Sequence, residues 1–214
     1  MATIELHGIL LAAGESRRMG FPKPLLKIDS ETYLTRLVAA MLTAVPNLTL
    51  VLGAQADRVR AAAPTDARVA IVQNDNFTRG QLSSLKTGLA AAPPTAQAVM
   101  VHLIDHPMVC PATFGGVVAA YARTGAAIVI ARYDGRRGHP VIFDRALFGE
   151  LMAAPEEEGA RAVVRADPSR VAYFDAADSG IITDLDTPDD LARAGLPRMS
   201  VSTISESGRR SKQK

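Results

Sequence analysis

The sequence has little of several residue types that define whole classes of protein. A single cysteine, Cys110, excludes a disulfide framework and any metal or iron–sulfur site built from several cysteines. Tryptophan is absent and aromatic residues make up only 5% of the chain, so the core must be mainly aliphatic. No apolar run approaches the roughly 18 residues of a membrane span, and residues 1–7 lack the pattern of a secretory signal. We therefore expect a cytoplasmic protein without a membrane partner.

The charge of the chain is nearly balanced overall but unevenly distributed. The formal net charge is +2, yet residues 198–214 contain five basic residues against one acidic residue. A segment with little apolar content and charge of one sign tends to stay disordered. The sequence therefore predicts one folded domain over residues 1–197 and a disordered, basic, serine-rich tail over residues 198–214. The body has no basic stripe interleaved with aromatic residues, so we do not expect nucleic acid as a partner.

Short apolar runs alternate along the chain with segments of helical periodicity. A content of 48% hydrophobic and 21% charged residues allows a large core and excludes global disorder. The pattern predicts strands at residues 7–12, 48–52, 69–73, 98–104, 126–131, 140–143, 171–175 and 181–185, and helices at residues 32–44, 55–63, 83–92, 111–123, 146–153, 159–166 and 189–194. Such alternation is typical of βαβ units. We predict an α/β fold with a single doubly wound, mostly parallel sheet and helices on both faces.

A glycine-rich segment follows the first predicted strand, at the sheet edge where such folds bind ligands. Residues 11–26 read LAAGESRRMGFPKPLL. Glycines and small alanines let the backbone approach a ligand, and consecutive amides can hold an anion beside the charges of Arg17, Arg18 and Lys23. The spacing matches neither the P-loop nor the dinucleotide-binding fingerprint. An anion-binding loop and a tight turn with solvated arginines both remain open.

Carboxylates stand at two other predicted strand ends. Asp105 follows the apolar run that ends at Ile104, and Asp186 follows a later run, with Asp184 at the same parity. Magnesium prefers one or two protein carboxylates together with phosphate oxygens and water, and Asp105 with Asp186 suits that preference. The alternative role of residues 184–190 is to start a helix, and we expect this segment to serve both purposes.

Other polar residues have ordinary structural explanations. Ser83 and Ser84 open a predicted helix, where capping is the default role. His102 has the opposite parity to Asp105 on the predicted strand, so the two side chains should not converge on a zinc ion. A histidine packed within the strand is favoured instead. Cys110 has no apparent base nearby, which argues against a nucleophile.

The segment from Leu11 to Leu26 contains every fixed position of the motif L-A-A-G-x-S-x-R-M-G-x-x-K-x-L-L. In this it resembles the molybdenum cofactor cytidylyltransferases and the wider group of guanylyl- and sugar-nucleotidyltransferases. The resemblance extends over roughly residues 9–194. Further matching segments are Asn74 and residues 80–85 (GQLSSL), 103–107 (LIDHP), 138–141 (GHPV), 159–161 (GAR) and 184–191 (DLDTPDDL). The resemblance implies a Rossmann-like nucleotidyltransferase domain over residues 1–197.

The resemblance also implies roles for individual residues. Arg18, Lys23 and Asp105 would be catalytic, and Asp105 and Asp186 would bind Mg²⁺. The residues that would bind the nucleotide are Leu11, Ala12, Ala13, Gly14, Ser16, Arg18, Lys23, Asn74, Gly80, Ser83 and Ser84.

Three further residues would face the acceptor, namely His106, His139 and Asp184. Two positions depart from the family pattern. Relatives often have Gly or Ala in place of Ile104, and Gln or Met in place of His106.

The implied reaction is a magnesium-dependent transfer of a nucleoside monophosphate from a nucleoside triphosphate to a phosphate-bearing acceptor, with release of pyrophosphate. CTP is favoured because L-A-A-G and the proline before Lys23 match the cytidylyl relatives, whereas guanylyl relatives tend to have L-A-G-G and Asp. The implied acceptor is the phosphate of the molybdopterin cofactor, with a molybdenum hydroxylase as a further partner.

Three alternatives remain open on the sequence alone. The first is a nucleotidyltransferase for a sugar-phosphate or another small phosphate acceptor. The second is a non-catalytic nucleotide- or cofactor-binding chaperone for the maturation of a molybdoenzyme. The joint presence of Arg18, Lys23, Asp105 and Asp186 argues against it, because binding alone would not need all four. The third is a nucleic-acid binder that acts through the basic tail.

Overall fold

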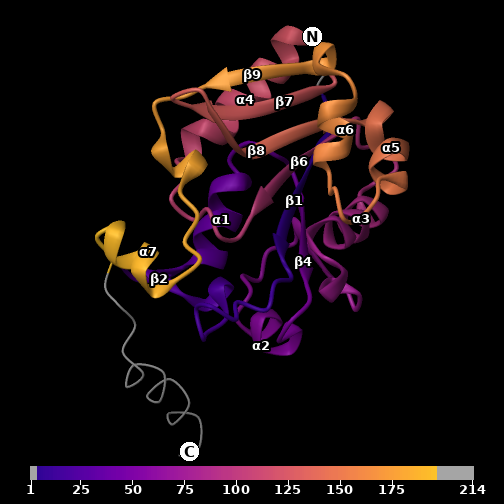
Figure 1. Cartoon of the computed structure of the whole chain (residues 1–214). Helices are drawn as coiled ribbons and strands as arrows, with labels where there is room; N and C mark the ends of the chain where they lie inside the picture. The colour runs from indigo at the N-terminus through magenta and orange to yellow at the C-terminus, as the bar shows by residue number, and fades with distance from the viewer. Residues whose placement is uncertain (1–3, 197–214) are drawn as a thin grey trace, which may run out of the picture.

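The computed structural model describes residues 4–196 and arranges them around one seven-stranded sheet (Figure 1). The strands are β1 (Leu6–Ala12), β4 (Leu48–Leu52), β5 (Val69–Gln73), β6 (Ala98–Leu103), β7 (Ile128–Tyr133), β8 (Arg136–Asp144) and β9 (Val171–Asp175). Their order is β5-β4-β1-β6-β8-β7-β9, and only β8 runs antiparallel to its neighbours in this sheet. A short hairpin of β2 (Lys27–Ile28) and β3 (Glu31–Thr32) forms a separate two-stranded sheet.

Helices cover both faces of the large sheet. Because side chains alternate along a strand, Leu10 of β1 packs into one hydrophobic core and Ile9 into another. The first core includes side chains of α1 (Tyr33–Met41), α2 (Ala56–Ala61), α4 (Pro111–Thr124) and α7 (Pro188–Arg193). The second core includes side chains of α3 (Gln81–Ala91), α5 (Phe148–Ala153) and α6 (Arg161–Ala166). The predicted doubly wound, mostly parallel sheet is therefore confirmed.

The strand predicted at residues 181–185 is wrong. The segment contains the end of a 3-10 helix, η5 (Ser179–Ile182), followed by an irregular stretch. The helix begins where the side chain of Asp178 accepts a hydrogen bond from Gly180 N at 3.0 Å. Ile181 and Leu185 are both 0% exposed, so the apolar residues that suggested a strand are buried from a turn and a loop. Apolar content alone does not distinguish these cases.

Strand β8 begins at Arg136 rather than at the predicted residue 140, because a tight hairpin joins it to β7. The turn residues Asp134 and Gly135 have positive φ angles of 47° and 73°, as two-residue hairpins favour. Since β8 runs antiparallel to β6, its first residues lie at the edge where the parallel strands end. Residues 136–139 thereby join the edge at which ligands are expected.

Two sequence expectations concern the ends of the chain and membranes. The tail predicted at residues 198–214 lies outside the described residues. Within residues 4–196, no helix has both the length and the apolar character needed to cross a bilayer.

Gly88 of α3 lies where this helix crosses β1 and β4. A Cβ atom at this position would lie 2.6 Å from Cγ2 of Ile9 and 3.1 Å from Cγ2 of Val51. We expect Gly88→Ala to lower the free energy of unfolding by about 1–3 kcal/mol, because buried branched side chains would have to move. Urea denaturation followed by circular dichroism measures this effect.

Gly115→Ala in α4 is the matched control. A Cβ atom at Gly115 would meet no described heavy atom within 4 Å beyond its own helix and chain neighbours. Alanine there should raise the free energy of unfolding by up to about 1 kcal/mol, because it is the better helix former. Equal effects of the two substitutions would show that the contact between α3 and β1 is looser than described.

Candidate active site

The segment after β1 forms a tight loop that Ser16 organises. Ser16 has a positive φ of 54°, and its carbonyl oxygen accepts hydrogen bonds from Met19 N at 3.0 Å and Gly20 N at 3.1 Å. The Ser16 hydroxyl Oγ accepts a further hydrogen bond from Lys23 N at 3.0 Å. Lys23 begins the short 3-10 helix η1 (Lys23–Leu25). Ser16 thus fixes the point at which Lys23 leaves the loop.

The ammonium group of Lys23 lies between two carboxylates from distant parts of the chain. Nζ donates a hydrogen bond to Oδ1 of Asp186 and lies 3.7 Å from Oδ2 of Asp105. The guanidinium of Arg18, which is more exposed, donates to Oδ2 of Asp186. The side chains of Lys23 and Asp186 are only 12% and 17% exposed, so solvent screens their attraction less than at an open surface. The four predicted charged residues therefore meet at one place.

Asp186 and Asp105 differ in how their oxygens are satisfied. Partial burial would raise the pKa of Asp186, but hydrogen bonds and charges from Lys23 and Arg18 outweigh it and hold that pKa below its usual value. Oδ1 of Asp105 is buried and has no hydrogen-bond partner among the described residues. Carboxylate oxygens are the donors that a hard divalent cation requires, and one of them is unsatisfied here.

Backbone hydrogen bonds hold the Asp105 loop against its neighbours. Ile104 N donates to Leu11 O at 3.1 Å, which ties the loop to β1. Leu185 N donates to Asp105 O at 2.8 Å, which brings the segment before α7 to the same place. The approach of the two acidic segments is therefore fixed by the main chain as well as by Lys23.

The helix start predicted within residues 184–190 is present. Thr187 and Asp190 form a capping box at the start of α7, and the Asp190 carboxylate also accepts a hydrogen bond from Asp186 N at 3.0 Å. Because residues 183–186 are not a strand, the predicted shared parity of Asp184 and Asp186 does not apply. Asp186 contacts Lys23, whereas Asp184 lines a larger cavity nearby.

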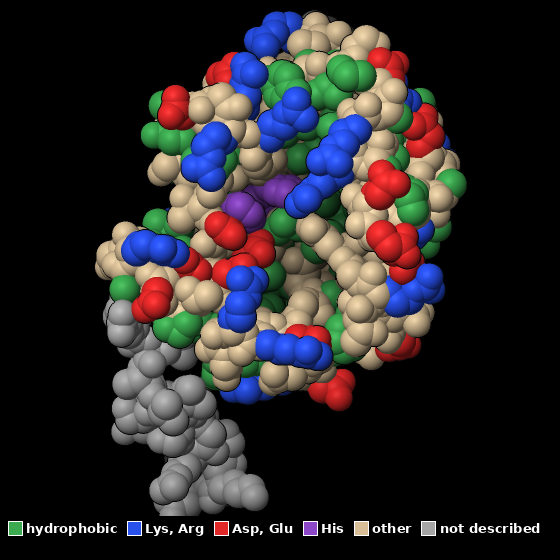
Figure 2. All heavy atoms as spheres, in the orientation of Figure 1, with side chains coloured by type: hydrophobic (Ala, Val, Ile, Leu, Met, Phe, Trp, Pro, Cys, Tyr) green, Lys and Arg blue, Asp and Glu red, His purple; other side chains and the backbone are tan. Residues whose placement is uncertain are grey.

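Two cavities adjoin at Asp105. The smaller has a volume of about 350 Å³ and lies between the loop after β1 and the start of α3. The larger has a volume of about 780 Å³ and is bordered by α3, β8 and α6. Both are lined by Leu11, Gln81, Leu103 and Asp105. Figure 2 shows this hollow, with histidines at its centre and both basic and acidic side chains around it.

A buried polar cluster supports the start of α3. Nδ2 of Asn74 donates hydrogen bonds to Oγ of Ser83 at 2.9 Å and to Oγ of Ser84 at 3.0 Å. Asn74, Ser83 and Ser84 are only 4%, 7% and 4% exposed, and Ser84 borders the smaller cavity together with Gly80. Gly80 has a φ of 108°, which a residue with a side chain rarely adopts. The cluster therefore shapes the wall of the cavity, and Asn74 and Ser83 support it from the interior.

Three histidines gather between β6, the Asp105 loop and β8, and the sequence analysis grouped only two of them, His106 and His139. The ring centroids of His106 and His139 are 5.5 Å apart, and that of His102 lies 6.3 Å from each. His102 is fully buried, lies edge-on to Phe114 at 5.0 Å, and donates from Nε2 to the carbonyl oxygen of His106 at 3.2 Å. The predicted packing of His102 within its strand is thus confirmed.

His102 and His139 are the two histidines of this cluster whose pKa values are lowered, so both are neutral at ordinary pH. Burial, followed by the charges of His139 and His106, lowers the pKa of His102 well below its ordinary value. Burial, followed by the charges of His106 and Arg161, lowers the pKa of His139 to about 3.

Within residues 4–196, no group of three or more His, Cys, Asp and Glu side chains is arranged to hold a metal ion.

Most of the predicted residues border the two cavities. Those at the smaller cavity are Leu11, Ala13, Gly14, Ser16, Lys23, Gly80, Ser84 and Asp105, and those at the larger cavity are Leu11, Asp105, His106, His139 and Asp184. Ala12 is instead 2% exposed and packs into the first core. Ile104, the position that departs from the family pattern, also packs into this core and borders the smaller cavity.

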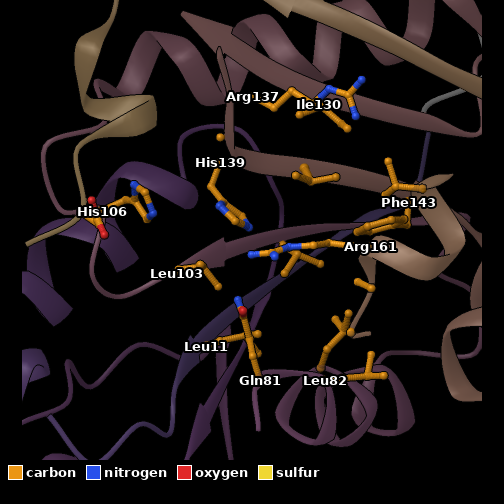
Figure 3. Close-up of a pocket in the computed structure, with 18 of the residues that line it drawn as sticks. Leu11, Gln81, Leu82, Leu103, His106, Ile130, Arg137, His139, Phe143 and Arg161 are labelled. Atoms are coloured by element: carbon orange, nitrogen blue, oxygen red, sulfur yellow. The ribbon is translucent and has the colours of Figure 1, made fainter. Parts of the chain in front are cut away.

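The sequence analysis did not single out several side chains of the larger cavity. Figure 3 shows Gln81 and Arg161 reaching into it from the starts of α3 and α6, and Arg137 at its far side. Gln81 and Arg161 belong to the GQLSSL and GAR segments, so a signal was present. The residue at which each helix begins decides which side chain of the segment faces a cavity. The motif alone does not identify that residue.

Three comparisons with known proteins find chains similar to this one. A model of the MobA-like NTP transferase domain family matches residues 8–171. The molybdenum cofactor cytidylyltransferase of Escherichia coli strain K12 is 25% identical over 187 residues, which cover 87% of this chain and 93% of that protein. The crystal structure of Rv0371c from Mycobacterium tuberculosis H37Rv has a TM-score of 0.75 and 32% identity, and the match covers 90% of this chain and 98% of that one.

A second structure of Rv0371c, a complex with manganese, is also similar to this chain. Its TM-score is 0.69 at 31% identity, and the match again covers 90% of this chain and 98% of that chain. The relatives thus resemble this chain over nearly the whole described region.

The buried neutral His102 makes stability depend on pH. Its folded pKa is lowered from 6.5, so below that pH the unfolded chain binds a proton that the folded chain does not. We expect the free energy of unfolding to fall as the pH is lowered from about 7 to about 5, by up to ~1.4 kcal/mol per pH unit for this group. Urea denaturation at several pH values measures the slope.

A His102→Gln variant should show a shallower slope over the same range, because glutamine does not titrate. His7 is present in both proteins and serves as an internal comparison. Burial lowers its pKa as well, whereas the hydrogen bond between its ring and Asn47 acts to raise that pKa. An unchanged slope in the His102→Gln variant would mean that His102 binds its proton in the fold.

Proposed function

The chain belongs to the MobA-like NTP transferase domain family, and from this premise we propose that it transfers CMP from CTP to the phosphate of the molybdopterin cofactor. A phosphate oxygen of the acceptor attacks the α-phosphorus of CTP. The bond from this phosphorus to the bridging oxygen then breaks, and pyrophosphate leaves with the electron pair. The observation that carries the proposal is the meeting of Lys23 with Asp105 and Asp186 beside two adjoining cavities.

The arrangement of the cavities supports a separate place for each substrate. The smaller cavity has the amide-rich loop 13–16, Lys23 and the start of α3 on its walls, which suits a triphosphate and its nucleoside. The larger cavity adjoins it at Asp105, as an acceptor site must. Attack in line with the leaving group requires both substrates to meet at this carboxylate.

Magnesium is the proposed metal, and Asp105 and Asp186 are the residues that would hold it. Two carboxylates that both approach Lys23 Nζ supply the hard oxygen donors that a divalent cation requires, and Oδ1 of Asp105 is unsatisfied. When bound, magnesium would neutralise charge on the phosphates as a Lewis acid. The manganese complex of Rv0371c is consistent with a divalent cation in this group of proteins.

In this proposal, basic side chains neutralise the charge on the phosphates that magnesium does not neutralise. All reacting partners are anionic, so the site must neutralise charge and align the attack with little covalent chemistry of its own. Lys23 and Arg18 would stabilise charge that develops on the α-phosphate and on pyrophosphate. The backbone amides of residues 13–16 would hold the β- and γ-phosphates. His106, His139 and Asp184 line the cavity proposed for the acceptor.

The choice of CTP and of molybdopterin rests on likeness. The LAAG sequence at residues 11–14 and the name of the Escherichia coli relative both favour cytidylyl transfer to the molybdenum cofactor. We include a molybdenum hydroxylase as the protein that receives the product, because the cytosine dinucleotide form would need a recipient.

Calorimetric titration with CTP, GTP, ATP and UTP, each with and without magnesium, tests the nucleotide half of the proposal. We expect CTP to bind at least about tenfold more tightly than the other three, and only with magnesium, because the carboxylates otherwise repel the triphosphate. Pyrophosphate release with molybdopterin and with sugar-phosphates then tests the acceptor. Turnover with sugar-phosphates alone would replace the acceptor, and tight binding without any turnover would favour a chaperone.

Asp105→Asn should lower the turnover number by on the order of 10²–10³, because the change removes one charge from a preorganised site. The fold should persist, since asparagine keeps the size of the side chain. The control is Asp66→Asn, which removes the ion pair between Asp66 and Arg68. Neither residue borders either cavity, so turnover should be unchanged. Near wild-type turnover in a folded Asp105→Asn protein would exclude Asp105 from the catalytic residues.

A further inference from the structure

The junction between the two cavities contains one side chain that can donate a hydrogen bond to a phosphate. Among residues 4–196, those that border both cavities are Leu11, Gln81, Leu103 and Asp105. The two leucines are apolar, and an ionised carboxylate such as that of Asp105 only accepts hydrogen bonds. The amide of Gln81 has two N–H donors and one acceptor oxygen. Gln81 is therefore the only donor among these four side chains.

The basic side chains of the cavities lie to either side of this junction. Lys23 borders the smaller cavity but not the larger one. Arg136, Arg137, Arg161 and Arg165 border the larger cavity but not the smaller one. Two phosphates that meet at Asp105 would repel each other, and a donor placed between them reduces that repulsion. Of the described side chains that border both cavities, Gln81 alone can do this.

The amide of Gln81 is free to bind a ligand. Gln81 is exposed, and within the described part of the chain its side chain has no hydrogen-bond partner. Figure 3 shows the side chain rising from α3 with its amide end inside the larger cavity. A phosphate oxygen that binds there would displace water and would not break a contact within the protein.

The backbone that carries Gln81 is held from the buried side of the helix. Gln81 is the first residue of α3 and follows Gly80. The hydroxyl of Ser83 donates a hydrogen bond to the carbonyl oxygen of Gly80 at 2.8 Å. Asn74 donates to Ser83 and Ser84 from the interior. The start of the helix is thus fixed, and the amide of Gln81 is presented to the junction from a rigid support.

We propose that Gln81 holds the two reacting phosphates together, with one N–H of its amide donating to the α-phosphate of CTP and the other to the phosphate of the acceptor. The inference rests on the proposed function, in which these two groups react. A donor shared by both phosphates aligns the attacking oxygen with the α-phosphorus and offsets their repulsion. Gln81 forms no covalent bond and transfers no proton. It is a catalytic residue that touches both substrates.

Gln81→Met tests the two hydrogen bonds, because methionine has a similar length and no N–H donor. We expect the turnover number for pyrophosphate release, measured with CTP, magnesium and molybdopterin, to fall on the order of 100-fold. The dissociation constant of CTP, measured by calorimetry, should change by less than about threefold, because water replaces the lost hydrogen bond when only one substrate is bound. The loss should therefore appear in the turnover number and not in the affinity for CTP.

Gln81→Glu separates catalysis from folding. Glutamate keeps the shape of the side chain, but its carboxylate replaces the two donors by a negative charge beside the phosphates. Since an acidic residue in the first turn of a helix is favourable, the thermal midpoint should stay the same or rise. Turnover should nevertheless fall further than in Gln81→Met. A merely structural role of Gln81 would not produce a stable protein with so little turnover.

Gln97→Met is the matched control. Gln97 precedes β6, whereas Asp105 follows this strand, so the two residues lie at opposite edges of the sheet. Gln97 is exposed, borders neither cavity, and accepts a hydrogen bond from Glu5 N at 3.1 Å through its side-chain oxygen. Its backbone N–H donates to Glu5 O at 2.8 Å, and this contact remains in the variant. Turnover and CTP affinity should equal those of the wild type.

Three results would overturn the inference while the proposed function stands. They are turnover of Gln81→Met within about threefold of the wild type, equal losses of turnover and CTP affinity in that variant, and a thermal midpoint of Gln81→Glu that falls together with its turnover. The second would assign Gln81 to the nucleotide alone.

The proposed function fails in a different way. If the wild type releases pyrophosphate with a sugar-phosphate and not with molybdopterin, the acceptor is wrong, and the same variants measured with the sugar-phosphate decide the role of Gln81. A wild type that releases no pyrophosphate with either acceptor would overturn the proposed function and this inference together.

Discussion

The whole site depends on one ammonium group that three chain segments share. Lys23 leaves the loop after β1, Asp105 follows β6, and Asp186 precedes α7, so the three residues are far apart in the sequence. Two carboxylates this close would repel each other and favour protonation without a cation near them. Lys23 removes that penalty and keeps the pKa of Asp186 low with the help of Arg18. The same attraction therefore stabilises the fold and keeps the acidic groups ionised for the proposed reaction.

The direction of β8 explains why the two cavities adjoin. In a purely parallel sheet, only the ends of strands and the loops after them reach the carboxyl edge. Because β8 runs antiparallel, its first residues, 136–139, reach that edge and place His139 beside the loop that carries Asp105. The first residue of α6, Arg161, extends into the same cavity (Figure 3). One reversed strand thus adds a second cavity at an edge where the loop after β1 already borders the first.

The sequence predicted the sheet and the charged centre because both depend on local patterns. Apolar runs gave β4, β5 and β9 with their observed bounds, and the motif at residues 11–26 located Lys23. It failed where a side chain's direction depends on tertiary structure. Asn74 and Ser83, predicted to contact the nucleotide, are buried and hydrogen-bonded to each other, a placement that the motif alone does not give. The parity argument for Asp184 and Asp186 presumed a strand that does not form, because Ile181 and Leu185 are buried from a turn and a loop.

The basic side chains near the two cavities differ in whether they are paired with a carboxylate of the protein. At the nucleotide end, Lys23 and Arg18 already hold a carboxylate, so the entry of a triphosphate with its cation exchanges one set of charge pairs for another. At the other cavity, Arg161 has no carboxylate within ion-pair distance among the described residues, but Glu156, Glu157 and Glu158 line the same space, so an entering phosphate would gain a guanidinium partner and also meet negative charge. Basic side chains that are paired near one cavity and unpaired in the other would thus allow two different anions to bind at adjoining positions.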